Sequence, residues 1–203
     1  MSAQVARGTL TISPAGAAGA QTIVFQYNPA QLRRTLVPQF VGGETSSRSQ
    51  SLLYANPPVE TIDLQLEIDA LDQDAVSGVG PRESGILPQL CALEMTLYPS
   101  TAQQTALASA MASGTLEVGA AAVPQVQFGW GSQRSAPVQI SELSITEEAF
   151  DAALSPIRAS VELKMRVIST ADVDPGDPNY SPYLAYQRSK ETLAKQGYGK
   201  PPG

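Results

Sequence analysis

Val59–Asp69 reads VETIDLQLEID, and this stretch decides the fold class. From Ile62 onward, apolar residues alternate strictly with Asp, Gln and Glu, so every apolar side chain of an extended strand falls on one face. Val161–Val167, VELKMRV, has the same period of two. The two segments predict β-strands with one buried and one wet face, which is typical of antiparallel sheets.

Weaker alternation continues on both sides of these strands. It occurs in four further segments, 8–12, 22–27, 126–130 and 138–145. Turn-forming pairs rich in Pro, Gly and Asn separate the segments: Asn28-Pro29, Gly42-Gly43, Pro57-Pro58, Gly129 with Gly131, and Ser155-Pro156. Six or more strands of this kind predict a mainly β protein, an antiparallel β-barrel or sandwich.

One helix, over about residues 84–98, is expected to pack on this β structure. Apolar residues recur in it at spacings of four, three and four, which gives one apolar stripe: Ile86, Leu90, Leu93 and Leu97. Pro99 cannot continue the helix and is expected to end it. Cys91 lies among these residues and is expected to be a small buried core residue. Residues 101–122, rich in Ala, Ser and Thr, are expected to form a flexible loop, with a short helix as the alternative.

The 203 residues are enough for one domain, which we place at residues 1–172. Residues 173–203, rich in Pro, Gly and Tyr, are expected to form an extended arm with a short helix near 183–195, and the first 20 residues also differ from the middle. The start of the chain lacks the pattern of a signal peptide, and no stretch approaches the ~20 apolar residues of a membrane-spanning helix. Synthesis in the cytoplasm without direct membrane insertion is therefore expected.

Residue counts narrow the functional classes. The sequence has no His and one Cys, which excludes Ser-His and Cys-His nucleophilic machinery and a cysteine zinc cluster. The 13 basic and 19 acidic residues give a net charge of -6, and no basic run exceeds Arg33-Arg34, so a nucleic-acid binder is not expected. Paired carboxylates, lysine chemistry and a carboxylate-bound hard cation remain open for an enzyme, and a hydrolase that uses carboxylates is the enzymatic alternative. We predict no enzyme, no catalytic residue, no metal and no cofactor.

Two acidic groups and one aromatic residue need a separate interpretation. The first acidic group could in principle gather Ca²⁺ but lacks EF-hand spacing, so a solvated face is favoured: Asp63, Glu67, Asp69, Asp72 and Asp74. The second group, Glu147-Glu148 with Asp151, is considered as a catalytic pair, but a solvated face is again favoured. Trp130, flanked by two glycines, could serve as a sugar-stacking platform, but a core or subunit-contact anchor is favoured.

Four strings of the sequence, taken in order, carry a resemblance to a known family. FQYNP at Phe25–Pro29 is followed by Leu32, then by ETIDLQLEIDALDQ, LPQLCALEMTLYP and, from Val126 to Val167, VQFGWGSQRSAPVQISELSITEEAFDAALSPIRASVELKMRV. These strings resemble the opening strand and turn, the central strand, the helix and the second half of the tube-like proteins of contractile injection systems, the phage-tail-related particles of bacteria. The resemblance covers about residues 5–170, and its second half is specific. Ser155 stands where the family often has Asn.

The resemblance is to the tube-initiating or tube-to-hub adaptor group at the baseplate, which shares the β-barrel of phage tail-tube and Hcp-type ring proteins. It implies a non-catalytic subunit of a ring, usually a hexamer, whose partners are its own copies, the inner tube protein, the spike or hub protein and other baseplate subunits. Many relatives carry a C-terminal LysM domain that binds peptidoglycan, and this sequence shows none. The particle could be cytoplasmic, membrane-anchored or released. The alternative function is a ligand- or carbohydrate-binding β-barrel module.

Two sets of residues follow as candidates for this role. Aromatic, arginine and turn residues are expected at the subunit interface, with core packing as the alternative for the aromatic residues and an Arg158–Asp151 pair for the arginine: Phe25, Tyr27, Asn28, Pro29, Trp130, Arg134, Phe150, Asp151 and Arg158. The polar faces of the two strongest strands are expected either to line an aqueous channel or to form an outer wet face: Asp63, Gln65, Glu67, Glu162, Lys164 and Arg166.

Overall fold

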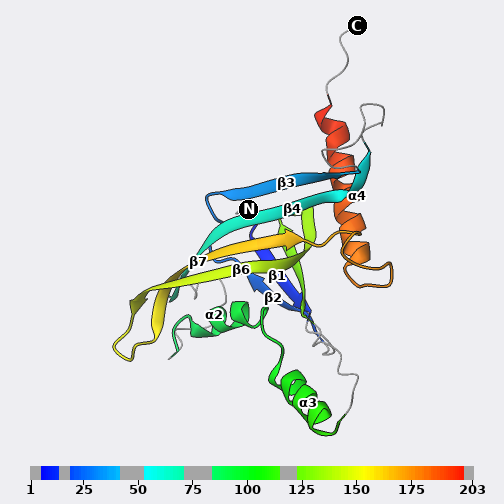
Figure 1. Cartoon of the computed structure of the whole chain (residues 1–203). Coiled ribbons are helices and arrows are strands. Elements are labelled where there is room, and N and C mark those ends of the chain that lie inside the picture. Colours follow the sequence, from blue (N-terminus) through cyan, green and yellow to red (C-terminus); the bar gives the residue numbers. More distant parts are fainter. Residues whose placement is uncertain (1–5, 14–18, 42–52, 71–83, 115–122, 199–203) are drawn as a thin grey trace.

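One antiparallel sheet forms most of the molecule (Figure 1). The computed structural model describes residues 6–13, 19–41, 53–70, 84–114 and 123–198. Seven strands pair in the order β2-β1-β5-β6-β7-β4-β3. Their bounds are β1 Gly8–Ser13, β2 Gln21–Val24, β3 Leu32–Phe40, β4 Tyr54–Asp69, β5 Gln125–Trp130, β6 Arg134–Phe150 and β7 Pro156–Val167. The mainly β prediction is confirmed.

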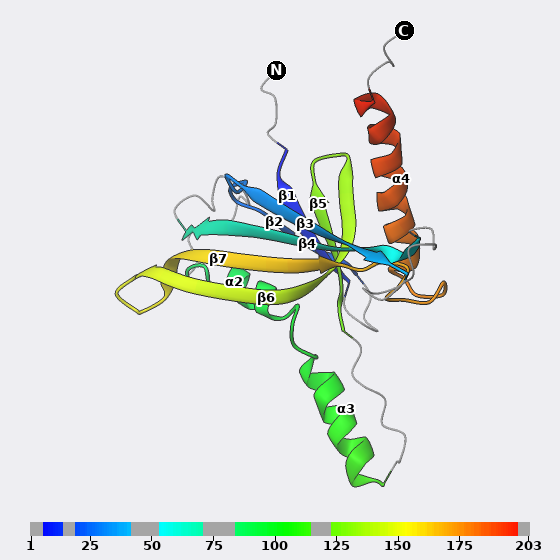
Figure 2. The same cartoon turned by 45° about the horizontal axis from the view of Figure 1, so that its top comes forward.

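The sheet is open and does not close into a barrel, which corrects the prediction of a closed one. β2 pairs with β1 alone and β3 with β4 alone, so each has one free edge within the described part of the chain. The two edges also differ in length, with four residues in β2 and nine in β3. Closure requires the first and last strands to pair, and the sheet instead curls without joining them (Figures 1 and 2).

The core lies where the period-two pattern of the sequence places it. In β4 and β7 the paired residues Ile62 and Met165, and Leu64 and Leu163, are directly opposite each other and buried. Leu10 and Phe128 extend the same buried cluster into β1 and β5. Since each buried apolar side chain contributes roughly 1.5–3 kcal/mol, this face holds the sheet together.

β3 was not expected from the sequence, and its composition explains why. It reads LRRTLVPQF, has no apolar alternation, and contains Pro38, where the pairing with β4 shifts register. Proline is tolerated on an edge strand because its missing N–H is not needed there. Pro57-Pro58, read as a turn, lies inside β4 at the end that pairs with β3. Gly42-Gly43 lies outside the described residues.

The predicted helix is shorter than expected. α2 spans Leu87–Glu94, with Pro88 in its first turn, and it buries Leu90 and Leu93. Leu97 lies beyond its end and is exposed, and Cys91 is also exposed, which corrects the expectation that the cysteine is buried. Leu90 and Leu93 are three positions apart and share one face, whereas Cys91 is turned by about 100° from Leu90.

The expected flexible loop contains a helix. α3 spans Thr101–Ala112 and begins with a capping box: the Ser100 hydroxyl accepts from the Gln103 N–H, and the Gln103 side chain accepts from the Ser100 N–H. Two orphan donors of the first turn are satisfied in this way. α3 buries no residue, and it extends away from the sheet (Figure 2). Residues 115–122 lie outside the described part.

The C-terminal segment also differs from an extended arm. α4 spans Tyr180–Gly197 and includes the short helix expected near 183–195. Tyr183 and Tyr186 are buried in the main core, and the helix packs beside the start of β6 (Figure 1). Within the described residues, no helix combines the length and hydrophobicity that crossing a membrane would require.

Candidate functional site

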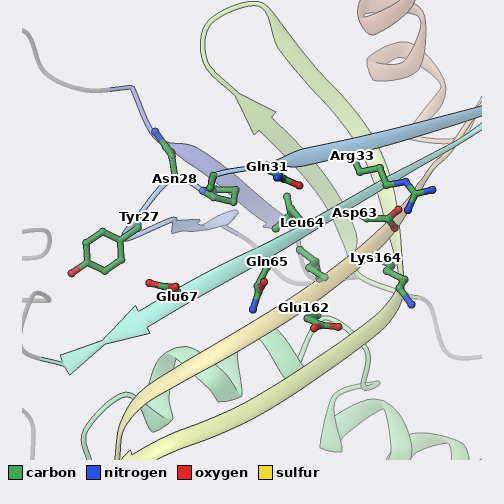
Figure 3. A pocket seen from close by; sticks show the side chains of 13 residues that line it. Tyr27, Asn28, Gln31, Arg33, Asp63, Leu64, Gln65, Glu67, Glu162 and Lys164 are labelled. Atoms are coloured by element: carbon green, nitrogen blue, oxygen red, sulfur yellow. The ribbon is translucent and has the colours of Figure 1, made fainter.

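A hollow lies over the polar faces of β4 and β7 (Figure 3). It has a volume of about 660 Å³. Five of the six residues expected to line a channel lie along it, because they alternate with the buried residues of the two strands: Asp63, Gln65, Glu67, Glu162 and Lys164. The turn between β2 and β3 forms one end, with Tyr27, and Arg33 lies near the other.

This polar surface is held by cross-strand contacts. Gln65 Nε2 donates to Ser160 Oγ at 2.7 Å, and Lys164 Nζ lies 2.7 Å from Glu142 Oε2, which raises the pKa of the Lys164 ammonium. The sixth candidate, Arg166, pairs with Asp172 beyond the end of β7 and does not line the hollow. The charges along the hollow are mixed, because the carboxylates of Asp63, Glu67 and Glu162 lie beside Arg33 and Lys164.

The FQYNP turn joins the N-terminal strand to this hollow. Asn28 Oδ1 accepts from Gly8 N–H at 3.0 Å, and Asn28 Nδ2 donates to the Ala6 carbonyl at 2.7 Å. Tyr27 and Pro29 line the hollow, and Tyr27 is exposed. The asparagine of the motif therefore has a structural role in this chain, while Tyr27 remains accessible for contact.

Two of the aromatic candidates pack within the chain. Phe25 is 3% exposed, and its ring centroid lies 6.4 Å from that of Phe128. Trp130 is half-buried and stacks on Phe128, with ring centroids 6.1 Å apart. A Cβ on Gly8 would lie 2.4 Å from the Phe25 ring, so the backbone of β1 approaches these rings closely. The structure thus places Phe25 in the core and leaves Trp130 at its margin.

Three of the remaining candidates, Phe150, Asp151 and Arg158, lie at the hairpin between β6 and β7, whereas Arg134 lies at the other end of β6, opposite Trp130 of β5. Phe150 is exposed, and one Asp151 carboxylate oxygen accepts from the N–H groups of Ala153 and Ser155, both at 2.8 Å. Arg158 does not pair with Asp151, as considered from the sequence. It bonds to Asp69 across β4 and β7 at 2.8 Å, and this hydrogen bond raises the pKa of the Arg158 guanidinium.

A buried carboxylate was missed by the sequence analysis. Glu60 is 3% exposed and receives three partners: Tyr186 Oη at 2.8 Å, Lys190 Nζ at 2.6 Å and Arg34 Nη2 at 2.7 Å. Burial alone would raise the pKa of Glu60, but the hydrogen bonds from Lys190, Tyr186 and Arg34 lower it overall. Glu60 could have been found, because it precedes Ile62 by two positions and therefore lies on the buried face of β4.

Apolar residues exposed along β3 were also missed. Leu36 and Val37 are about half exposed, and Phe40 stacks on the exposed Tyr54 with ring centroids 5.3 Å apart. A hollow of about 610 Å³ lies here, lined by Leu36, Pro38 and the first residues of β4. A strand with one free edge and exposed apolar side chains forms a surface that normally has a partner.

The acidic side chains considered as metal ligands do not form a cluster in the described residues. No group of three or more His, Cys, Asp or Glu side chains is placed there to hold a metal ion. Asp63, Glu67 and Asp69 follow one strand, and Asp69 is engaged by Arg158, while Asp72 and Asp74 lie outside the described part. No protein-family model matches the sequence, and no curated protein is significantly similar to it.

Proposed function

We propose that this chain is a structural subunit of a contractile injection system, which forms a ring at the baseplate, joins the spike hub to the inner tube and initiates tube assembly. The observation that carries the proposal is the open sheet, whose edge strand β3 carries exposed apolar residues and pairs only with β4 in the described chain, so that its outer edge is free. The ring would be assembled in the cytoplasm. Its partners would be copies of itself, the tube protein, the hub protein and other baseplate subunits.

The edges of the sheet support association with further copies. β3 carries exposed Leu36 and Val37 where natural edge strands usually carry charge or cover. The opposite edge, β2, presents a second free strand. Pairing of unlike edges is a heterologous contact, and such a contact closes into a ring when the rotation between neighbours allows it. A hexamer is the expected size, as the resemblance implies.

The motifs that resemble the tube-like family correspond to continuous parts of the fold. Phe25–Pro29 forms the link from β2 to β3, and Val126–Val167 contains the meander of β5, β6 and β7. This correspondence favours a tube-like fold of the Hcp type, completed by neighbouring copies rather than closed within one chain. In such a ring the polar hollow over β4 and β7 would face the channel.

Copurification tests the function directly. The chain is co-expressed with a tube protein and a spike protein of an injection system from the same genome, if it encodes them, and a tag on the spike protein isolates the complex. We expect a complex in which this chain lies between spike and tube, seen by electron microscopy. Leu36→Lys should abolish it, whereas Met111→Lys, an equal change at an exposed residue of α3, should not. A monomer that binds neither protein, and whose Trp130 fluorescence responds to sugars, would contradict the proposal and favour the carbohydrate-binding alternative.

A further inference from the structure

A basic hollow lies between α4 and the β5–β6 hairpin. It has a volume of about 340 Å³, and Trp130 and Leu193 form apolar parts of its wall. Arg34, Arg134 and Lys190 also line it. Glu60 neutralises one of these three cations, because both Arg34 and Lys190 bond to the same carboxylate. The protein as a whole carries a net charge of -6, so an excess of positive charge at one place is a local feature of this hollow.

Arg134 is the cation of this hollow that is free to bind a ligand. It has no ion pair among the described residues, while Arg34 and Lys190 are held by Glu60. Arg134 is half-buried at the first residue of β6, directly opposite Trp130 in the pairing with β5. Ser189 Oγ donates to the Gln133 carbonyl at 2.8 Å and fixes α4 against this hairpin. An arginine without an ion pair beside an aromatic wall suits a carboxylate that is attached to an apolar group.

The hairpin between β6 and β7 presents that combination. Glu147 and Glu148 are exposed near its end, and Phe150 is exposed at the last residue of β6. Leu154 is 80% exposed, with a backbone φ of 64°, a left-handed conformation that costs a residue with a side chain about 1–2 kcal/mol. The two bonds that Asp151 accepts from Ala153 and Ser155 stabilise this turn and keep the leucine outside.

The hairpin cannot fill the hollow of its own chain. Arg134 is the first residue of β6 and Phe150 the last, so they lie at opposite ends of a strand of 17 residues. At roughly 3.3 Å per residue the separation is on the order of 50 Å. The hairpin tip and α4 lie at opposite sides of the molecule (Figures 1 and 2). Any contact between the two surfaces therefore joins two molecules.

We infer that the hollow beside α4 receives the β6–β7 hairpin of a second copy of this chain. In this contact Arg134 binds Glu147 or Glu148, while Phe150 and Leu154 pack on Trp130 and Leu193. The contact is heterologous, so each copy offers one free end to the next. It leaves both edges of the sheet available. This inference rests on the proposed ring and adds a second contact to it.

Disulfide cross-linking tests the contact in the full chain. Cys91→Ser first removes the exposed cysteine. One variant then carries Leu154→Cys and a second carries Gln133→Cys, and the two are mixed under mild oxidation. We expect a covalent dimer from this mixture. Leu154→Cys mixed with Arg188→Cys, an exposed position of α4 that does not line the hollow, should give less than a tenth as much.

Charge reversal provides the second arm. Arg134→Glu should reduce the cross-linked dimer at least tenfold, and Glu147→Arg with Glu148→Arg in the other chain should restore it. Arg188→Glu, the same change outside the hollow, should leave it unchanged. Each variant is first shown to unfold at the wild-type urea concentration.

The outcomes separate this inference from the proposed function. An oligomer in the ultracentrifuge without the Leu154–Gln133 cross-link would overturn the hairpin contact alone and leave the hollow to another acidic partner. The cross-link without any complex with tube and spike proteins would keep the contact and overturn the proposed function. A monomer at every concentration, without a cross-link, would overturn the hairpin contact and remove its support for the ring.

Discussion

Glu60 joins three distant parts of the chain through one carboxylate. Arg34 belongs to β3, and Tyr186 and Lys190 belong to α4, 126 and 130 positions away from Glu60. Lys190 Nζ also lies 4.0 Å from the centre of the Tyr186 ring. Because the carboxylate is buried and hydrogen-bonded on both oxygens, removing its charge leaves the two cations without their partner. The attachment of α4 therefore depends on this residue.

We expect Glu60→Gln to lower the free energy of unfolding by about 2–4 kcal/mol, since a buried ion-paired group loses its charge. Urea unfolding followed by circular dichroism measures the change. Glu142→Gln is the matched control, because Glu142 pairs with Lys164 at the surface and should cost at most ~1 kcal/mol. Equal losses of unfolding free energy for the two substitutions would show that the ion pairs of Glu60 contribute no more than a surface ion pair does.

The pH dependence follows from the lowered pKa of Glu60. A carboxyl whose pKa is lower in the folded than in the unfolded chain stabilises the fold above its ordinary value of 4.5, and this contribution is lost as the pH falls through its folded value. The pKa of Asp172 is also lowered, because the hydrogen bonds from Ser169 and Arg166 outweigh burial, so it acts in the same direction. The stability difference between wild type and Glu60→Gln should therefore be largest near pH 7 and shrink toward pH 3. A difference independent of pH would contradict this assignment.

Gly85 and Gly131 differ in what a side chain would cost at each position, a strained backbone conformation at both and a steric clash at Gly85 alone. Both have positive φ, 55° and 64°, but a Cβ on Gly85 would lie 2.1 Å from the Pro156 carbonyl oxygen, whereas one on Gly131 meets open space. Gly131→Ala should cost about 1 kcal/mol from its backbone conformation alone. Gly85→Ala should cost about 3 kcal/mol or more, because the hydrogen bond from Ile86 N–H to Pro156 is displaced as well. Thermal unfolding of both variants tests the ranking, which similar losses would refute.

Residue-level prediction from the sequence succeeded where the local period was sufficient. The buried and polar faces of β4 and β7 follow from alternation alone, whereas the shared surface of Asp63, Gln65 and Lys164 also requires the two strands to pair with each other. The partner of Arg158 is 89 positions away in Asp69, and no local pattern contains that information. The burial of Glu60, in contrast, could be predicted locally, because Glu60 is two positions before Ile62 and therefore lies on the same buried face of β4.

Among the elements, α3 depends on its cap more than on packing. It buries no residue in the core, so its stability comes from its own sequence and from the Ser100–Gln103 capping box. We expect Ser100→Ala to cost about 1 kcal/mol of local helix stability, seen as roughly fivefold faster amide exchange over 101–112. Global unfolding should not change. Ser109→Ala, within the exposed face of the same helix, should slow that exchange, and a change of the same sign would contradict the account.

The elements that the sequence did not predict lack a periodic apolar face. β3 is an exposed edge with a proline, and its strand character comes from pairing with β4. α4 was foreseen as a short helix, but its length and its packing depend on contacts of Tyr183 and Tyr186 with distant strands. Alternation, strong in two segments and weaker in four, identified six of the strands, whereas long-range pairing decided the strand order and left the sheet open.

At the scale of the whole molecule, the stability of the single chain and the association of copies depend on different surfaces. Leu36 is 47% exposed on the free edge, so Leu36→Lys should change the unfolding free energy of the single chain by no more than about 0.5 kcal/mol. The same substitution should weaken association at least tenfold, which sedimentation velocity measures. Met111→Lys on α3 should change neither quantity. Loss of stability with unchanged association would place Leu36 in the core of the fold rather than at a contact.

The central claim is that copies of this chain complete its open sheet. An electron microscopy reconstruction of the assembled ring tests it most directly, at a resolution that separates neighbouring strands. We predict that the edge strand Leu32–Phe40 of each copy is covered along its length by a strand of the next copy, so that the sheets are continuous around the ring. Copies whose β3 edges face solvent, or a protein that never forms a ring with the tube and spike proteins, would contradict the claim.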